Sequence, residues 1–236
     1  DDGHVRLVQS VDGEDVAVKG RHFDSVRIGS VAVHADGMLV LSHVKGHEAA
    51  GFGGAIKQLG MGSASRGGKL DQHASARPWL NFLTCVKCGA CVEECPEDAI
   101  RIGTFSKIDK TKCVGCAACI AVCPRGSIKM NVLRASVSRT FHEKVAEYAL
   151  AAQKGKWNVY VNFVFNVTRG CDCMGRPMKA VGPDLGVLAS RDPVALDQAC
   201  LDALDRAGGK RFRGRYILEY AESIGLGSRK YDLVEP

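Results

Sequence analysis

The sequence of 236 residues has no long hydrophobic run, few aromatic residues and no strong excess of charge of either sign. No stretch approaches 18 uncharged apolar residues, which excludes a membrane-spanning helix. The net charge is only +6, and aromatic residues make up 6% of the chain. A nucleic-acid surface needs a larger basic stripe with interleaved aromatic residues, so we expect no nucleic-acid partner.

The remaining composition is that of a globular protein. Hydrophobic residues make up 46% and charged residues 25%, so a sizeable core is expected and wholesale disorder is not. Nothing at the start resembles a charged leader followed by an apolar stretch. The chain begins at Asp1 rather than Met, so we expect a processed product or a piece of a longer protein.

Cysteine is abundant, with eleven residues in the chain. They are too sparse for a small disulfide scaffold, and their number is odd. Eight of them lie in an internal repeat, CVKCGACVEECPEDAIRI at 85–102 and CVGCAACIAVCPRGSIKM at 113–130, in which 8 of 18 positions are identical. The repeat predicts a compact duplicated module at 81–133.

Each repeat carries the spacing C-x2-C-x2-C-x3-C followed by proline, which is the bacterial ferredoxin pattern for two [4Fe–4S] clusters. In this pattern the fourth cysteine of each run ligates the other cluster. The first cluster is therefore expected on Cys85, Cys88, Cys91 and Cys123, and the second on Cys113, Cys116, Cys119 and Cys95. We expect the shared ligands to tie the repeats together, and bound metal to supply much of the folding energy.

Other uses of these cysteines fit the spacing less well. Disulfides give no reason for two copies of one spacing, and a [3Fe–4S] cluster would need a missing ligand. Zinc sites usually combine two C-x2-C pairs that are separated by a longer span. The leading hypothesis is an electron-transfer protein or redox subunit with redox partner proteins of unknown identity and unknown oligomeric state. Purely structural clusters are an alternative. The oxygen-sensitive cofactors and the missing export leader predict a cytoplasmic location.

Both flanks of the module show strand and helix patterns. Short apolar runs predict strands at Val16–Val18, Val26–Ile28 and Met38–Leu41, the last buried on both faces. Helices are predicted at Ala55–Leu59 and at Ile217–Ile224. A third helix is predicted to begin at Thr140, which can form a capping box with Glu143, and a fourth to run from a cap at Asp192 to Gly208. Residues 63–68 are predicted to form a loop. The economical architecture is an α/β (α+β) host domain, residues 1–80 and 134–236, interrupted by an inserted ferredoxin-like module.

Residues 157–168 alternate between two kinds of side chain. One face takes Trp157, Val159, Val161, Phe163, Phe165 and Val167, and the other takes Asn158, Tyr160, Asn162, Val164, Asn166 and Thr168. A period of two over this length predicts a strand with one buried, apolar face and one mostly polar face.

Two further groups follow predicted strands, where sites of α/β proteins collect. Cys171 and Cys173 lie in a loop after the long strand, and His43 and His47 follow the strand at 38–41. Because imidazole and thiolate are common metal ligands, these four residues are a candidate third site. Surface histidines without a ligand are the alternative. Cys200, on the apolar stripe of a helix, is expected to be a small buried residue.

The third site supports a second hypothesis for the function. The chain would then be an oxidoreductase with a metal or substrate site in the host domain, and the clusters would conduct electrons to it. Whether the chain is an enzyme stays open at this point, and no catalytic residue is assigned.

Four segments resemble the family called domain of unknown function 362: SHVKGH (42–47), GFGGAIKQLGMG (51–62), the CDC loop (171–173) and LGVLASRDPVALDQA (185–199). The resemblance covers most of the chain. Many members carry a two-cluster ferredoxin module, so the resemblance implies an iron–sulfur protein of undetermined activity in the cytoplasm. Members are usually longer at the N-terminus, which implies that part of the host domain is missing here.

Overall fold

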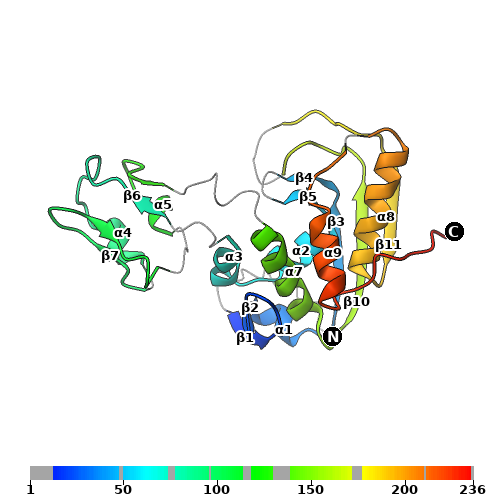
Figure 1. The fold of residues 1–236 in the computed structure, drawn as a ribbon, viewed down its shortest axis with the longest axis horizontal. Helices are drawn as coiled ribbons and strands as arrows, with labels where there is room; N and C mark the ends of the chain where they lie inside the picture. The colour runs from blue at the N-terminus through cyan, green and yellow to red at the C-terminus, as the bar shows by residue number, and fades with distance from the viewer. Residues whose placement is uncertain are drawn as a thin grey trace, which may run out of the picture. The chain divides into compact units, whose positions relative to one another are not determined.

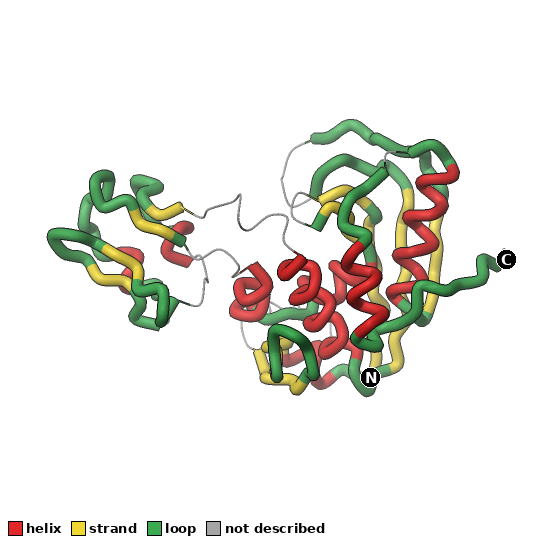
Figure 2. Tube along the Cα trace, in the orientation of Figure 1, coloured by secondary structure: helices red, strands yellow, loops and turns green. Residues whose placement is uncertain are grey.

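The protein divides into two compact units in a computed structural model (Figures 1 and 2). The structure describes residues 13–47, 50–73, 78–95, 97–113, 118–129, 139–171, 177–209 and 211–234. The host unit comprises Asp1–Gly68 together with His142–Pro236, and the cysteine unit comprises Lys69–Phe141. Both contain helices and strands, which confirms the predicted mixed α/β class. The module predicted at 81–133 lies inside the cysteine unit.

A three-stranded sheet forms the centre of the host unit, in the order β11-β10-β3. Its strands are β3 (Gly37–His43), β10 (Trp157–Val164) and β11 (Gly186–Ser190). β3 and β10 pair in parallel, and β10 and β11 pair antiparallel. The connection between the two parallel neighbours contains the whole cysteine unit. The helices α2 (Ala55–Gly62) and α8 (Pro193–Arg206) pack on this sheet (Figure 1).

The face of β10 that packs on the helices is the opposite of the predicted one. Asn158, Tyr160 and Asn162 are buried, whereas Trp157 on the other face is 61% exposed. The amide of Asn162 donates to Asp197 of α8 at 2.8 Å. The amide of Asn158 and the hydroxyl of Tyr160 also donate to Gln153, the last residue of α7 (Arg139–Gln153). Helices thus supply acceptors for these donors, and a buried polar group with a partner carries little penalty.

The apolar face of the sheet is correspondingly open to solvent. Leu39 and Leu41 of β3 are 64% and 52% exposed, and Val187 of β11 is 55% exposed. The prediction that the strand at 38–41 is buried on both faces is therefore wrong. A continuous apolar run has the same sequence pattern whether one or both of its faces are covered.

Smaller elements complete the host unit. They are the hairpin β1 (Gly13–Ala17) and β2 (Ser25–Gly29), α1 (Ser30–His34), the hairpin β4 (Lys45–His47) and β5 (Gly51–Gly53), and α9 (Tyr216–Ser223). Two helices cross the division between the units, α3 (Arg66–His73) and α7 (Arg139–Gln153). The loop predicted at 63–68 is wrong for its last three residues, because α3 begins at Arg66. None of the helices in the described ranges is long and apolar enough to cross a membrane.

The carboxylates of α7 connect this helix to other parts of the host unit. Glu147 is fully buried and accepts hydrogen bonds from the backbone N–H of Arg21 at 2.8 Å and the hydroxyl of Tyr220 at 2.6 Å. Glu143 accepts from the side chains of Arg21 and Tyr216. The predicted capping box of Thr140 and Glu143 is therefore wrong, because α7 already begins at Arg139 and the carboxylate of Glu143 bonds to residues far away in the sequence.

The cysteine unit repeats its elements as its sequence repeats. The helices α4 (Ala90–Glu93) and α5 (Ala118–Ala121) lie 28 residues apart, as do the strands β7 (Ile100–Arg101) and β9 (Ile128–Lys129). β7 pairs with β8 (Lys107–Ile108), and β9 pairs with β6 (Trp79–Leu80). Four buried residues form the core of the unit, Cys91 and Ile100 from one repeat and Cys119 and Ile128 from the other.

Candidate functional site

Four cysteines from both repeats line one small cavity in the cysteine unit. They are Cys85, Cys88, Cys91 and Cys123. Cys91 is supplied by α4, and Cys123 follows α5. These are the four residues that the ferredoxin spacing assigns to a first cluster. The cavity has largely apolar walls, which include Leu80, Val86, Ile102 and Ile128.

Two neighbours of the first run adopt a backbone conformation with positive φ. Lys87 has φ = 60° and Gly89 has φ = 85°. Positive φ is readily adopted by glycine but is uncommon for lysine. These left-handed residues flank Cys88, in the short segment that supplies Cys85, Cys88 and Cys91 to one cavity.

The last cysteine of each run accepts a hydrogen bond from the backbone. The N–H of Ala99 donates to Cys95 Sγ at 3.3 Å, and the N–H of Ser127 donates to Cys123 Sγ at 3.2 Å. The residue before each donor has positive φ, 46° at Asp98 and 58° at Gly126. The two repeats therefore present the same N–H to sulfur contact, a kind that stabilises thiolates and their metal complexes.

The surroundings of the cavity shift the pKa of Cys91 and of Cys123 in opposite directions. Burial is the main cause that raises the pKa of the Cys91 thiol, and the neighbouring Cys85, Cys123 and Cys88 raise it further. At Cys123 burial also opposes ionisation, but the surrounding backbone N–H groups outweigh it and lower the pKa of that thiol. A site that gathers several thiolates needs positive charge among them, which a metal centre supplies.

The described residues of the second predicted set lie in the same unit. Cys119 belongs to the core of the cysteine unit, and Cys95 is partly buried and packs against that core. The N–H of Cys113 donates to the carbonyl of Asp109 at 2.9 Å. Cys116 lies outside the described residues. This set therefore stays a prediction.

Ser106 is a neighbour of the first set that the sequence pattern did not indicate. Its side chain is 4% exposed, and the thiol of Cys85 donates to its hydroxyl at 3.7 Å. The Ser106 hydroxyl also accepts from the N–H of Gly103 at 3.4 Å. Ser106 lies between the two repeats, where no spacing rule applies, so only the fold could identify it.

The candidate third site is incomplete in the described part of the chain. His43 Nε2 lies 2.9 Å from the carbonyl of Phe165, and His47 Nδ1 accepts the N–H of Ala50 at 3.0 Å. Cys171 is buried, and Cys173 lies outside the described residues. Within the described residues, no three His, Cys, Asp or Glu side chains are grouped as ligands of one metal ion. The third site stays a hypothesis.

A family model described as Domain of unknown function (DUF362) matches residues 2–202. The chain belongs to this family. The matched range of this DUF362 protein contains all residues of the cysteine unit and the three strands of the host sheet. Neither the curated proteins nor the solved structures contain a match to the chain. The family description names no activity.

Proposed function

We propose that the protein binds two [4Fe–4S] clusters in its cysteine unit and transfers single electrons, as an electron-transfer protein or a redox subunit with protein partners. The supporting observation is the single cavity that Cys85, Cys88, Cys91 and Cys123 line together. Three of these cysteines belong to the first repeat and one to the second, as the ferredoxin pattern requires.

The residues around the cavity fit such a cluster in three respects. The donors are cysteine sulfurs, which Fe–S clusters use as ligands. Apolar side chains limit the access of water, and the backbone N–H of Ser127 contacts the sulfur of Cys123. When bound, each cluster supplies a centre that gains or loses one electron, and burial and N–H contacts set its reduction potential.

The surface charge of the cysteine unit bears on its partners. Residues 85–130 contain seven Lys or Arg and five Asp or Glu. A docking site for a redox partner on this segment therefore does not depend on a strongly acidic surface, and bound clusters with their thiolates make the local charge more negative. We propose redox partners whose docking surfaces carry both positively and negatively charged side chains.

The direct test is anaerobic reconstitution of the full chain with iron and sulfide, followed by metal analysis and visible spectroscopy. We expect about eight irons per chain and a brown colour that dithionite bleaches. Cys88→Ala should lose roughly half of the iron, whereas the control Cys200→Ser in the core of the host unit should retain it. A colourless, iron-free product, or equal iron in both variants, would refute the proposal.

A second candidate function is an oxidoreductase whose substrate binds in the host unit, with the clusters as its electron path. The observation that favours it is a cavity that His47 and Gly170 line, beside the candidate third site. Metal that exceeds eight irons and is lost in the Cys171→Ser, Cys173→Ser double variant would support a third metal centre; retention of that metal would refute this location.

A further inference from the structure

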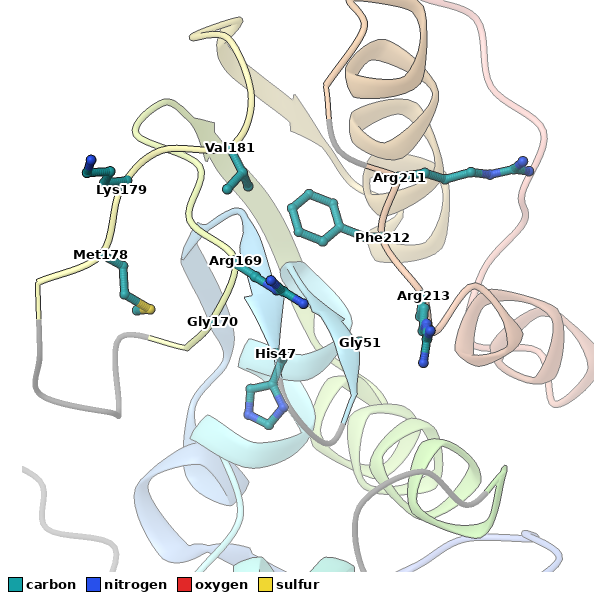
Figure 3. A pocket seen from close by; sticks show the side chains of 10 residues that line it. All are labelled: His47, Gly51, Arg169, Gly170, Met178, Lys179, Val181, Arg211, Phe212 and Arg213. Carbon is teal, nitrogen blue, oxygen red and sulfur yellow. The ribbon is translucent and has the colours of Figure 1, made fainter. Parts of the chain in front are cut away.

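A cavity of about 910 Å³ lies in the host unit (Figure 3). Three segments that are far apart in the sequence form it: the β4–β5 hairpin, the chain after β10, and residues 211–213 before α9. Its volume falls in the range of pockets for small organic ligands. The basic and aromatic side chains in its lining are those of His47, Arg169, Lys179, Arg211, Phe212 and Arg213.

The described residues that line this cavity carry charge of one sign. Four of them are positively charged, and none of them is acidic. Within the described residues, the side chains of Arg169, Lys179, Arg211 and Arg213 form no hydrogen bond or ion pair. By contrast Arg215, which lies outside the lining, pairs with two carboxylates of α8. Unbalanced cations in a concave surface concentrate anions.

Glycines hold two of the arginines at the cavity. A Cβ atom at Gly46 would lie 1.9 Å from the carbonyl oxygen of Arg169, and one at Gly51 would lie 2.5 Å from the carbonyl carbon of Arg213. Gly51 also has φ = 73°. Because only glycine permits this approach, the backbone of the hairpin packs directly on the backbone of both arginines. The fold therefore fixes where the backbone of each arginine lies, and both side chains are exposed.

The side chains divide into an inner and an outer group. Figure 3 shows Arg169 between Phe212 and His47, with Arg213 on the side of Gly51. Lys179 and Arg211 extend away from the centre of the cavity (Figure 3). The ring of Phe212 is 6% exposed and packs against Phe52 with 6.2 Å between ring centroids, so it is a rigid apolar wall.

We propose that this cavity binds a small organic anion, with a phosphate or carboxylate group held by Arg169 and Arg213 and an apolar body against Phe212. The planar guanidinium group donates two parallel hydrogen bonds to either kind of anion. Lys179 and Arg211, whose side chains extend away from the centre, add positive charge that attracts the anion. This binding needs no cluster in the cysteine unit, so it stands or falls independently of the proposed electron transfer.

The test is calorimetric titration of the full chain at constant ionic strength with phenyl phosphate, phthalate, inorganic phosphate and benzyl alcohol. We expect saturable binding of phenyl phosphate or phthalate, weaker binding of inorganic phosphate, and none of benzyl alcohol. The tighter of the first two ligands identifies the anionic group. Arg169→Gln and Arg213→Gln should each raise Kd at least about tenfold, the effect of losing a charge-assisted hydrogen bond.

Lys19→Gln is the matched control, because it removes one exposed positive charge of the host unit outside the cavity. It should leave Kd within about twofold, since distant exposed charges are screened by salt. Circular dichroism checks that the variants are folded, and Arg169→Lys replaces Arg169→Gln if that variant is not. The proposal is overturned if no anion binds saturably, if the control loses as much affinity as the arginine variants, or if short single-stranded DNA binds more tightly than the small anions.

Discussion

Replacing Asp197 by asparagine should abolish a pH dependence in the stability of the host unit. The carboxylate of Asp197 is 1% exposed and lies at the start of α2. It accepts the backbone N–H of Ala55 at 2.7 Å and of Ile56 at 3.0 Å, together with the amide of Asn162. Burial raises its pKa from 3.8 to about 6, although these hydrogen bonds lower it.

The size of the effect follows from this difference in pKa. One pH unit corresponds to about 1.36 kcal/mol, so the shift amounts to about 3 kcal/mol in total. The folded protein holds the proton more tightly than the unfolded chain does. The contribution of Asp197 to stability is therefore fully present below pH 3.8 and is lost as the pH rises through about 6. Between about pH 4.5 and pH 7.5, the wild type should lose about 2 kcal/mol that the variant does not lose.

Urea unfolding at several pH values measures this, with far-UV circular dichroism to follow the helices of the host unit. Other groups titrate equally in wild type and Asp197→Asn, so the difference between the two free energies of unfolding isolates this carboxylate. Glu219→Gln, which removes an exposed carboxylate of α9, should give a profile parallel to the wild type. A wild-type minus Asp197→Asn difference that stays constant with pH would refute the reasoning.

Three further predictions concern stability, and urea unfolding tests each of them. Glu147→Ala should cost about 3 kcal/mol or more, because it leaves partly buried N–H donors and the buried hydroxyl of Tyr220 without an acceptor; a cost below 1 kcal/mol would contradict this. Gly214→Ala should cost far more than Gly225→Ala. Both glycines have positive φ, but a Cβ at Gly214 would lie 1.9 Å from the carbonyl oxygen of Ala50, and none lies within 4 Å at Gly225; equal costs would remove that contact from the explanation. Asp192→Ala should cost about 1 to 2 kcal/mol, because Asp192 caps α8 and also accepts the N–H of Ser228; an unchanged urea midpoint would show that neither contact contributes.

Local signals in the sequence predicted local structure well. The cap at Asp192 is confirmed, since its side chain accepts the N–H groups of Val194 and Ala195. Phe141, Val145, Tyr148 and Ala152 are spaced at helical intervals in the sequence, and all four are buried on α7. Cys200 is fully buried, as its helical position indicated. These features depend on residues within a few positions of one another, which is why a pattern reveals them.

The choice of the buried face could not be predicted in this way. The alternation at 157–164 predicted a strand, but the face that is buried depends on Asp197 and other partners far away in the sequence. The strand also ends at Val164 rather than at residue 168, and Asn166 beyond it has φ = 48°. A period of two identifies two faces without stating which one the helices cover.

The candidate sites also differ in whether a local sequence pattern predicts them. The spacing of the repeats groups Cys123 with Cys85, Cys88 and Cys91, and the structure places these four around one cavity; what they bind stays a prediction. The cavity of Arg169 and Arg213 was not predicted, because its walls come from three separate segments without a common motif. The sequence feature related to this cavity is the pair Gly46 and Gly51, where the hairpin backbone contacts the backbone of Arg169 and Arg213.

The parallel pairing of β3 with β10 has a consequence for the order of folding. These neighbours are separated by 113 residues, so their pairing must close a very long loop. If the cysteine unit has already folded, about 40 flexible residues remain, and the entropic cost of closure falls by about 1 kcal/mol. Conditions that order the cysteine unit first should therefore speed assembly of the host sheet, and a chain emerging from the ribosome completes that unit before β10 is made.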